Sequence, residues 1–126
     1  MYQQGYNIYK NNSVNYASKD NLLLMLVDGA VKYAKMARQA IIDKDVQKAH
    51  NSLMRTQDIF TELIVTLDTS AADWTKPLIQ IYSFINEKLM EANMKKKVEI
   101  VDEILPLIEE VRDMWYEAYK KAKQNV

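Results

Sequence analysis

The chain has 126 residues, a length that suits one domain with a self-sufficient core. It has no cysteine, which excludes disulfide frameworks and thiolate metal clusters and permits a reduced, cytosolic setting. Its 17 basic and 17 acidic residues balance, and with only two glycines and two prolines it is expected to form few turns and long helices.

The distribution of charge and hydropathy argues against nucleic-acid binding and membrane insertion. The lysine runs at 95–97 and 120–123 lie beside acidic residues rather than in a one-sided basic field. No apolar run approaches the roughly 18–20 residues needed to span a bilayer. The first ten residues, MYQQGYNIYK, have neither a basic region nor an apolar run, so we expect no secretory signal.

Residues 1–17 differ from the rest of the chain. They hold one charged side chain, Lys10, and four tyrosines among asparagine, glutamine and serine. We interpret them as an N-terminal arm, irregular apart from a helical turn around Tyr6–Tyr9. Ser18 resembles a helix N-cap, so a helical bundle domain is predicted over residues 18–126.

Apolar residues at three- and four-residue spacing predict four helices, over about 18–42, 46–68, 74–94 and 100–122. Asp45 is suited to cap the second helix. Pro106 is tolerable only if the last helix starts close before it; otherwise we expect a kink. The expected core stripe of the first helix is Leu23, Leu26, Ala30, Tyr33, Ala37 and Ile41. The later stripes begin Val46, Ala49, Leu53 in the second helix, Leu78, Ile81, Ile85 in the third, and Val101, Ile104, Ile108 in the fourth.

Four amphipathic helices with short connections predict an all-α fold. The natural arrangement is an antiparallel four-helix up-down bundle with an N-terminal arm or short cap helix.

The helices carry more apolar residues than one stripe can use. In the first helix Leu22, Leu24, Met25 and Val27 fall outside the stripe, and Leu22, Met25 and Gly29 form a second track. A glycine in that track would let another backbone approach closely. Similar surplus residues in the second and third helices are Met54, Ile59, Ile64, Ile79, Tyr82 and Met90.

Two interpretations of this surplus remain open. Each helix could simply present a wide apolar face to the core. Alternatively, the surplus forms an external groove, covered by the tyrosine arm, by an amphipathic segment of a partner or by a second copy of the chain. The seven methionines would help such a surface adapt to a partner.

No residue pattern indicates an enzyme. His50 is the only histidine, and a phosphotransfer module using His50 is the alternative function. Such modules usually follow the histidine with a lysine and a glycine, whereas Leu53, Met54 and Arg55 follow here, so a solvent-facing histidine is the better interpretation. A di-iron carboxylate site would need a second histidine, so we expect no metal and no other cofactor.

Three segments together resemble one known family. They are YNIYKNNSVNYASKDNLLLMLVDGAVKYAKMARQAI, KAHNSLMRTQDIFTELIVTLD and VDEILPLIEEVRDMWYEAY. In this order they resemble the flagellar secretion chaperones of the FliS family over nearly the whole chain. The resemblance implies a cytoplasmic, non-enzymatic bundle that holds flagellin unpolymerised.

In that family the client is the disordered C-terminal segment of flagellin, and the complex is presented to the export gate protein of the flagellar type III apparatus. Other flagellar regulators are further candidate partners. Carried over by position, the resemblance implies these client-binding residues: Tyr6, Tyr9, Leu22, Met25, Leu26, Gly29, Arg55, Gln57, Asp58 and Ile59.

Overall fold

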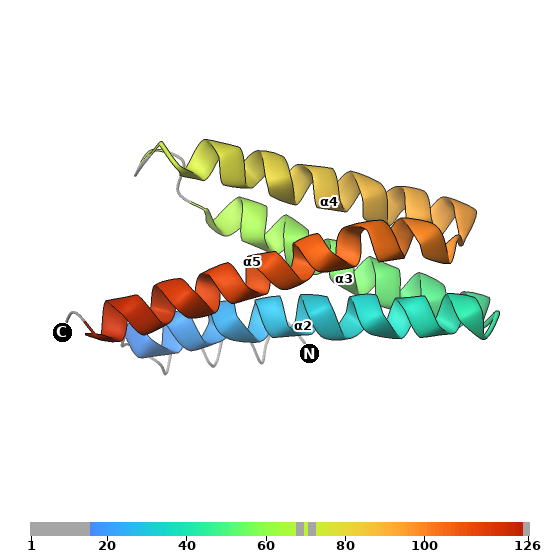
Figure 1. Cartoon of the computed structure of the whole chain (residues 1–126), viewed down its shortest axis with the longest axis horizontal. Coiled ribbons are helices and arrows are strands. Elements are labelled where there is room, and N and C mark those ends of the chain that lie inside the picture. Colours follow the sequence, from blue (N-terminus) through green and yellow to red (C-terminus); the bar gives the residue numbers. More distant parts are fainter. Residues whose placement is uncertain (1–15, 68–69, 71–72, 125–126) are drawn as a thin grey trace.

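The computed structural model describes residues 16–67, 70 and 73–124. Within them the chain forms four helices and no strand: α2 (Tyr16–Ile42), α3 (Val46–Thr66), α4 (Thr75–Lys95) and α5 (Val98–Gln124). Successive helices run in opposite directions (Figure 1). The predicted all-α antiparallel bundle is confirmed, whereas the expected turn around Tyr6–Tyr9 lies outside the described residues.

The connections begin and end close to where the sequence placed them. Asp45 caps α3 as predicted, because its carboxylate accepts a hydrogen bond from the backbone N–H of Lys48 at 3.1 Å. Lys96 ends α4 in the left-handed backbone region. The expected cap at Ser18 is wrong: α2 already begins at Tyr16, because neither Tyr16 nor Ala17 is a residue that stops a helix.

Pro106 lies more than two turns inside α5, since this helix begins at Val98 rather than near residue 100. A proline has no N–H to donate to the carbonyl of Asp102, one turn earlier. The axis of α5 changes direction in its N-terminal half (Figure 1). The kinked alternative is therefore the correct one.

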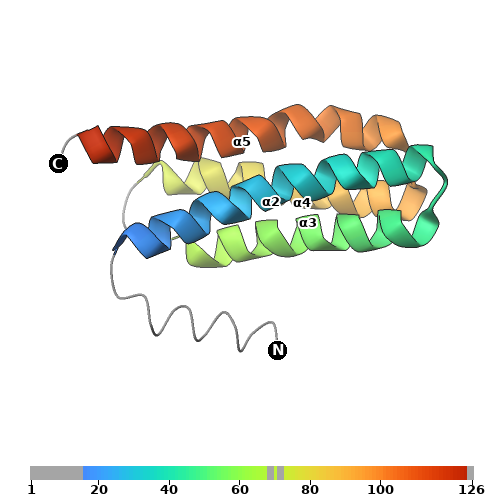
Figure 2. The ribbon, with the colours of Figure 1, turned by 90° about the horizontal axis from the view of Figure 1, so that it is seen from below.

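The helices form a ring in chain order. Each packs against its sequence neighbours, and α5 closes the ring against α2. The C-terminal end of α5 extends along α2 past the end of α4 (Figure 2). Consequently α2/α3 and α4/α5 are opposite faces of the bundle.

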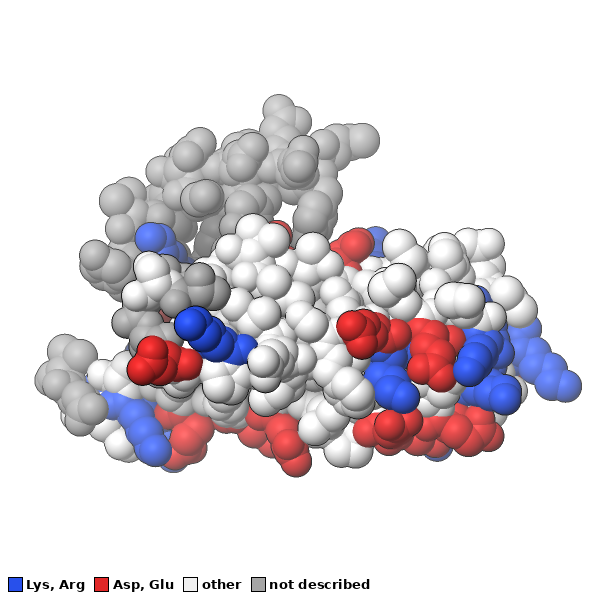
Figure 3. All heavy atoms as spheres, turned by 90° about the horizontal axis from the view of Figure 1, so that it is seen from above, with Lys and Arg blue, Asp and Glu red and all other residues white. Residues whose placement is uncertain are grey.

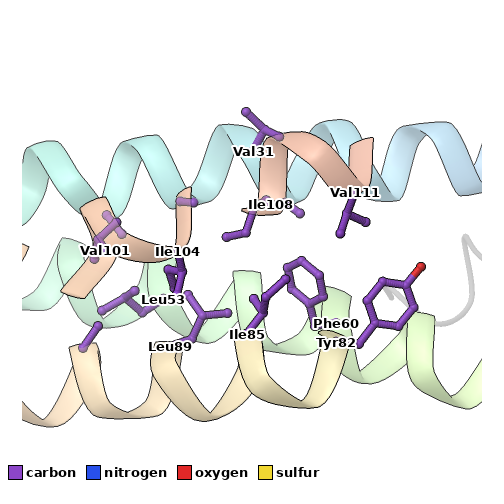
Figure 4. Close-up of a cluster of buried hydrophobic side chains, with 14 of the residues drawn as sticks. Val31, Leu53, Phe60, Tyr82, Ile85, Leu89, Val101, Ile104, Ile108 and Val111 are labelled. Carbon is purple, nitrogen blue, oxygen red and sulfur yellow. The ribbon is translucent and has the colours of Figure 1, made fainter. Parts of the chain in front are cut away.

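The core lies on the bundle axis and is filled mainly from three of the helices (Figure 4). The largest fully buried side chains there include Leu53, Phe60, Tyr82, Ile85, Leu89, Ile104 and Ile108. The α2 helix instead contributes small side chains: Val27, Ala30, Val31, Ala34, Ala37 and Ala40. Small residues on α2 therefore face large ones from the other helices.

Two expected stripes are out of phase with the structure. In α2 the surplus residues Leu24 and Val27 are buried, while Leu23 and Leu26 only flank the core. In α4 the expected core residue Ile81 is 43% exposed, and Tyr82 is fully buried in its place. Neighbouring apolar residues cannot both face the axis, and packing against two flanking helices decided between them.

An aromatic cluster joins the core to the end of the bundle where α4 begins. Trp115 Nε1 donates a hydrogen bond to Tyr82 Oη at 2.7 Å. The Tyr82 ring packs against Phe60, with ring centroids 5.8 Å apart, and Trp74 meets Trp115 edge-on at 6.3 Å. Burial raises the pKa of Tyr82 above its ordinary value, and the hydrogen bond from Trp115 opposes part of that rise.

The substitution Tyr82→Phe tests this bridge between α4 and α5. It keeps the ring but leaves Trp115 Nε1 without its acceptor, so we expect the free energy of unfolding at neutral pH to fall by about 0.5–1.5 kcal/mol. Urea denaturation followed by tryptophan fluorescence measures the change. An unchanged midpoint would show that the hydrogen bond contributes nothing.

The environment of Tyr82 also predicts that the free energy of unfolding depends on pH. Because the pKa of Tyr82 is raised in the folded state, its contribution to stability is complete below the ordinary tyrosine pKa of about 10. That contribution is lost as the pH rises through the folded-state pKa. The stability difference between the wild type and Tyr82→Phe should therefore shrink above about pH 10, where denaturation curves of both proteins can be compared.

Gly29 lies where α2 packs against Ile59 of α3. A Cβ atom at Gly29 would lie 3.2 Å from Ile59 Cδ1 and 3.9 Å from a ring carbon of Tyr33. The first distance is tight, but Ile59 Cδ1 is the end of a flexible side chain and can shift.

We therefore expect Gly29→Ala to leave the protein as stable as the wild type or up to about 1 kcal/mol more stable, because alanine favours a helix interior over glycine by that amount. Urea denaturation gives the value. A loss of more than about 1 kcal/mol would mean that α2 and α3 cannot yield at this crossing.

Candidate binding surface

An apolar surface runs along the α2/α3 contact, on the side of α2 that carries the predicted second track, and ends at a hollow beside Tyr33 and Arg55. Leu22, Leu26 and Gly29 are half-buried along this edge, and Met25 is 65% exposed. The surplus track is therefore outside the core, as the groove interpretation requires.

The groove has its matching wall on α3. Ile59 lies against Gly29, and Arg55 lies against Tyr33 one turn further along. In this antiparallel register Leu26 and Leu22 lie level with Glu62 and Thr66. We call the surface formed by Leu22, Met25, Leu26, Gly29, Tyr33, Arg55 and Ile59 the α2/α3 groove.

At one end of this surface Arg55 makes a cation–π contact with Tyr33. The Arg55 guanidinium lies 5.4 Å from the centroid of the Tyr33 ring and donates to Tyr33 Oη at 3.3 Å. Beside this pair is a depression of about 340 Å³, whose lining includes Met36, Gln47 and Asn51. A helical or extended segment lying in the groove could place a polar end here.

Two of the expected binding residues lie away from this groove. Gln57 shares a face of α3 with His50 and Thr61, both of which contact α4. Its side-chain amide lies 3.9 Å from Met54 Sδ on the same helix. Asp58 is exposed between the two faces. Leu22, Met25, Leu26, Gly29, Arg55 and Ile59 are brought together on one surface.

A second apolar surface lies between α3 and α4. Asn86 Nδ2 donates to Thr61 Oγ1 at 3.2 Å, and His50 Nδ1 lies 3.0 Å from Asn93 Nδ2. These contacts set a register in which Met54 lies level with Met90. We define the α3/α4 face as Met54, Gln57, Thr61, Ile64, Val65, Ile79, Asn86 and Met90.

The α3/α4 face contains no charged residue. Met90 is 54% exposed and Val65 is 74% exposed. Figure 3 shows a broad uncharged zone over the middle of the bundle, with charged groups gathered towards one end and along one edge. The buried Oδ1 atom of Asn86 accepts no hydrogen bond from the described residues.

Sequence reasoning missed several residues of these surfaces. Val65 of the α3/α4 face was not among the surplus residues, although it falls off the core stripe of α3. The pairing of Tyr33 with Arg55 joins residues 22 positions apart, and no local spacing signals it.

The described residues give little indication of a metal site or a catalytic site. No cluster of three or more histidine, cysteine, aspartate or glutamate side chains within them could hold a metal ion. His50 is exposed, and its Nδ1 atom is engaged with the Asn93 amide. No helix in the described part of the chain combines the length and hydropathy needed to cross a membrane.

Comparison with known proteins points to one family. The family model described as "Flagellar protein FliS" matches residues 1–122. The Flagellar secretion chaperone FliS of Bacillus subtilis (strain 168) is 29% identical over 123 residues, covering 98% of this chain and 92% of the relative. The protein of the same name from Escherichia coli (strain K12) is 32% identical over 108 residues, covering 84% and 79% of the two chains.

A solved structure supports the fold. It is titled "Crystal structure of flagellar chaperone from bacteria", and its TM-score is 0.75 at 16% sequence identity. The match covers 96% of this chain and 99% of that chain. On the family model and these relatives, the chain belongs to the FliS family of flagellar secretion chaperones.

Proposed function

We propose that the chain is a cytoplasmic export chaperone that binds the disordered C-terminal segment of flagellin. Binding there would prevent premature polymerisation, and the complex would be delivered to the flagellar type III export apparatus. The observation that carries this proposal is an apolar surface around α3, formed by the α2/α3 groove and the adjoining α3/α4 face.

The shape of this surface suits a client that is unfolded before binding. A segment that folds on binding loses chain entropy, so it needs a long apolar contact to recover that free energy. Because the groove and the face share α3, one segment can follow the groove and cross to the other side of the same helix. A compact, folded client could not reach both.

The chemistry of the surface also suits an apolar helical client. Methionine side chains such as Met25, Met54 and Met90 adapt their shape to the residues that cover them. Each large apolar side chain that becomes covered contributes roughly 1.5–3 kcal/mol. The exposed Arg55, beside Tyr33, supplies a polar contact that helps fix the position of the segment.

Other elements of the proposal rest on the family. The relatives' name, flagellar secretion chaperone, supports a role in export and fits a protein that is not an enzyme. Tyr6 and Tyr9 lie outside the described residues and stay predicted contact residues for the client or the export gate protein.

A peptide from the C-terminal end of flagellin tests the proposal directly. We expect a 1:1 complex by calorimetry and a gain of helicity by circular dichroism, because the client folds as it covers the apolar surface. No heat and no change in helicity at high micromolar concentrations would reject the function.

The double variant Leu22→Asp with Met25→Asp locates the contact. Neither side chain belongs to the set packed against the core, so we expect an intact bundle that has lost at least tenfold in affinity for the flagellin peptide. The matched control is Ile81→Asp, an exposed apolar residue of α4 that lies outside both surfaces and should leave the affinity unchanged. Equal affinities for all three proteins would place the client elsewhere.

A further inference from the structure

A third apolar surface lies between α4 and α5, on the side of the bundle opposite the α2/α3 groove. Three large side chains are similarly exposed on it: Ile81 at 43%, Phe84 at 42% and Met114 at 40%. We propose that this surface, the α4/α5 face, is a docking site for a basic amphipathic helix of a second protein partner.

The ion pair between Lys88 and Glu103 shows the register in which the two helices meet. Lys88 Nζ lies 3.7 Å from the Glu103 carboxylate across the α4/α5 contact. In this antiparallel register Phe84 lies level with Leu107, and Pro77 lies level with Met114. We define the α4/α5 face as Pro77, Ile81, Phe84, Lys88, Glu103, Leu107, Glu110 and Met114.

Ile81 and Phe84 of α4 stay partly exposed although α5 runs alongside α4. The α4/α5 contact is the least extensive of the four helix contacts. The two helices splay apart towards the end where α5 turns to follow α2 (Figure 1). Their facing apolar side chains therefore stay only half-covered.

Acidic residues outnumber basic ones along the α5 edge of this face, where Lys121 follows the last glutamate of the row. Glu99, Glu103, Glu110 and Glu117 repeat along α5 at spacings of four and seven residues, which places them on one side of the helix. Red side chains gather along the lower edge of Figure 3, over α5. Among the described residues, no lysine or arginine lies within ion-pair distance of Glu110. The acidic row therefore has carboxylates available for a basic partner.

Lys88 illustrates how the face receives a cation. Its ammonium group lies 5.9 Å from the centroid of the Phe84 ring, 3.6 Å from Glu91 and 3.7 Å from Glu103. A lysine or arginine of a docked helix would meet the same surroundings, an aromatic ring beside carboxylates, near Glu110. Apolar side chains of that helix would cover Ile81 and Met114.

The acidic row along α5 favours a basic helix over the other possible occupants of the α4/α5 face. Residues 1–15 of this chain carry only one charged side chain, Lys10, so they do not offer the basic complement. The uncharged α3/α4 face has no comparable carboxylate row. Because the α4/α5 face lies on the side opposite the α2/α3 groove and shares no residue with the α3/α4 face, the second partner can bind while the client stays in place.

The probe is a fluorescein-labelled peptide of about 18 residues, built from leucine and lysine with leucines at i, i+3, i+4 and i+7, which spans about five helical turns. Fluorescence anisotropy with the full chain should give saturable binding that weakens as salt is added. A peptide of the same composition with the leucines scrambled should bind at least tenfold more weakly, because it has no apolar face.

Variants then place the peptide on the bundle. Phe84→Glu with Met114→Glu should reduce affinity at least tenfold, and Glu103→Gln with Glu110→Gln should reduce both the affinity and its salt dependence. The matched control is Met90→Glu, which introduces a charge at a similarly exposed position of the α3/α4 face and should leave affinity unchanged. Circular dichroism checks that each variant stays helical.

Several results would overturn the proposal. They are absence of saturable binding, equal affinity for the scrambled peptide, and no loss in the Phe84→Glu with Met114→Glu variant. Displacement of the probe by excess flagellin peptide would also overturn it, because the two sites would then be one. If only the flagellin peptide fails to bind, the proposed function is rejected while the docking site on the α4/α5 face stands. The two proposals can therefore be tested separately.

Discussion

The alanine-rich core side of α2 governs how the rest of the bundle is arranged. Ala30, Ala34 and Ala37 are almost fully buried, and they leave the centre to large side chains such as Phe60 and Tyr82 from the other helices. With small residues on its core side, α2 can lie close to both α3 and α5. Gly29 extends this close approach to the edge of the helix, against Ile59.

This arrangement determines which apolar residues of α2 remain at the surface. The axis of the bundle accepts Leu24, Val27 and Val31, so Leu22 and Met25 are left outside the core, Leu22 half-buried and Met25 exposed. A run of six apolar residues exceeds what one core face can hold, and the excess must lie beside a neighbouring helix. The α2/α3 groove is therefore a consequence of packing as much as of the presence of leucine and methionine.

The existence, order and approximate bounds of the helices could be predicted from sequence, because the apolar spacing is regular over most of each helix. The phase of α2 could not, since Leu22 to Val27 are all apolar and every phase fits them equally well. The same ambiguity affected Ile81 and Tyr82. There the structure selects the tyrosine, whose hydroxyl finds a partner in Trp115, a residue far away in the sequence.

The candidate site was predictable to a similar degree. Family resemblance named Gly29, Arg55 and Ile59, and all three lie in the α2/α3 groove. It also named Gln57, which lies towards α4, because residues 57 and 59 of one helix project about 200° apart. Which side of α3 faces α2 follows only from the packing of the whole bundle.

The zero net charge of the chain conceals an uneven distribution of charge over its faces. The α3/α4 face has no formal charge, whereas α5 carries a row of carboxylates beside Phe84 and Met114. Apolar surface without charge can be covered by an apolar segment without desolvating ions, whereas apolar surface beside carboxylates favours a partner that brings cations. One small bundle can in this way discriminate between two partners by electrostatics, even though both surfaces are built from the same kinds of exposed aliphatic and methionine side chains.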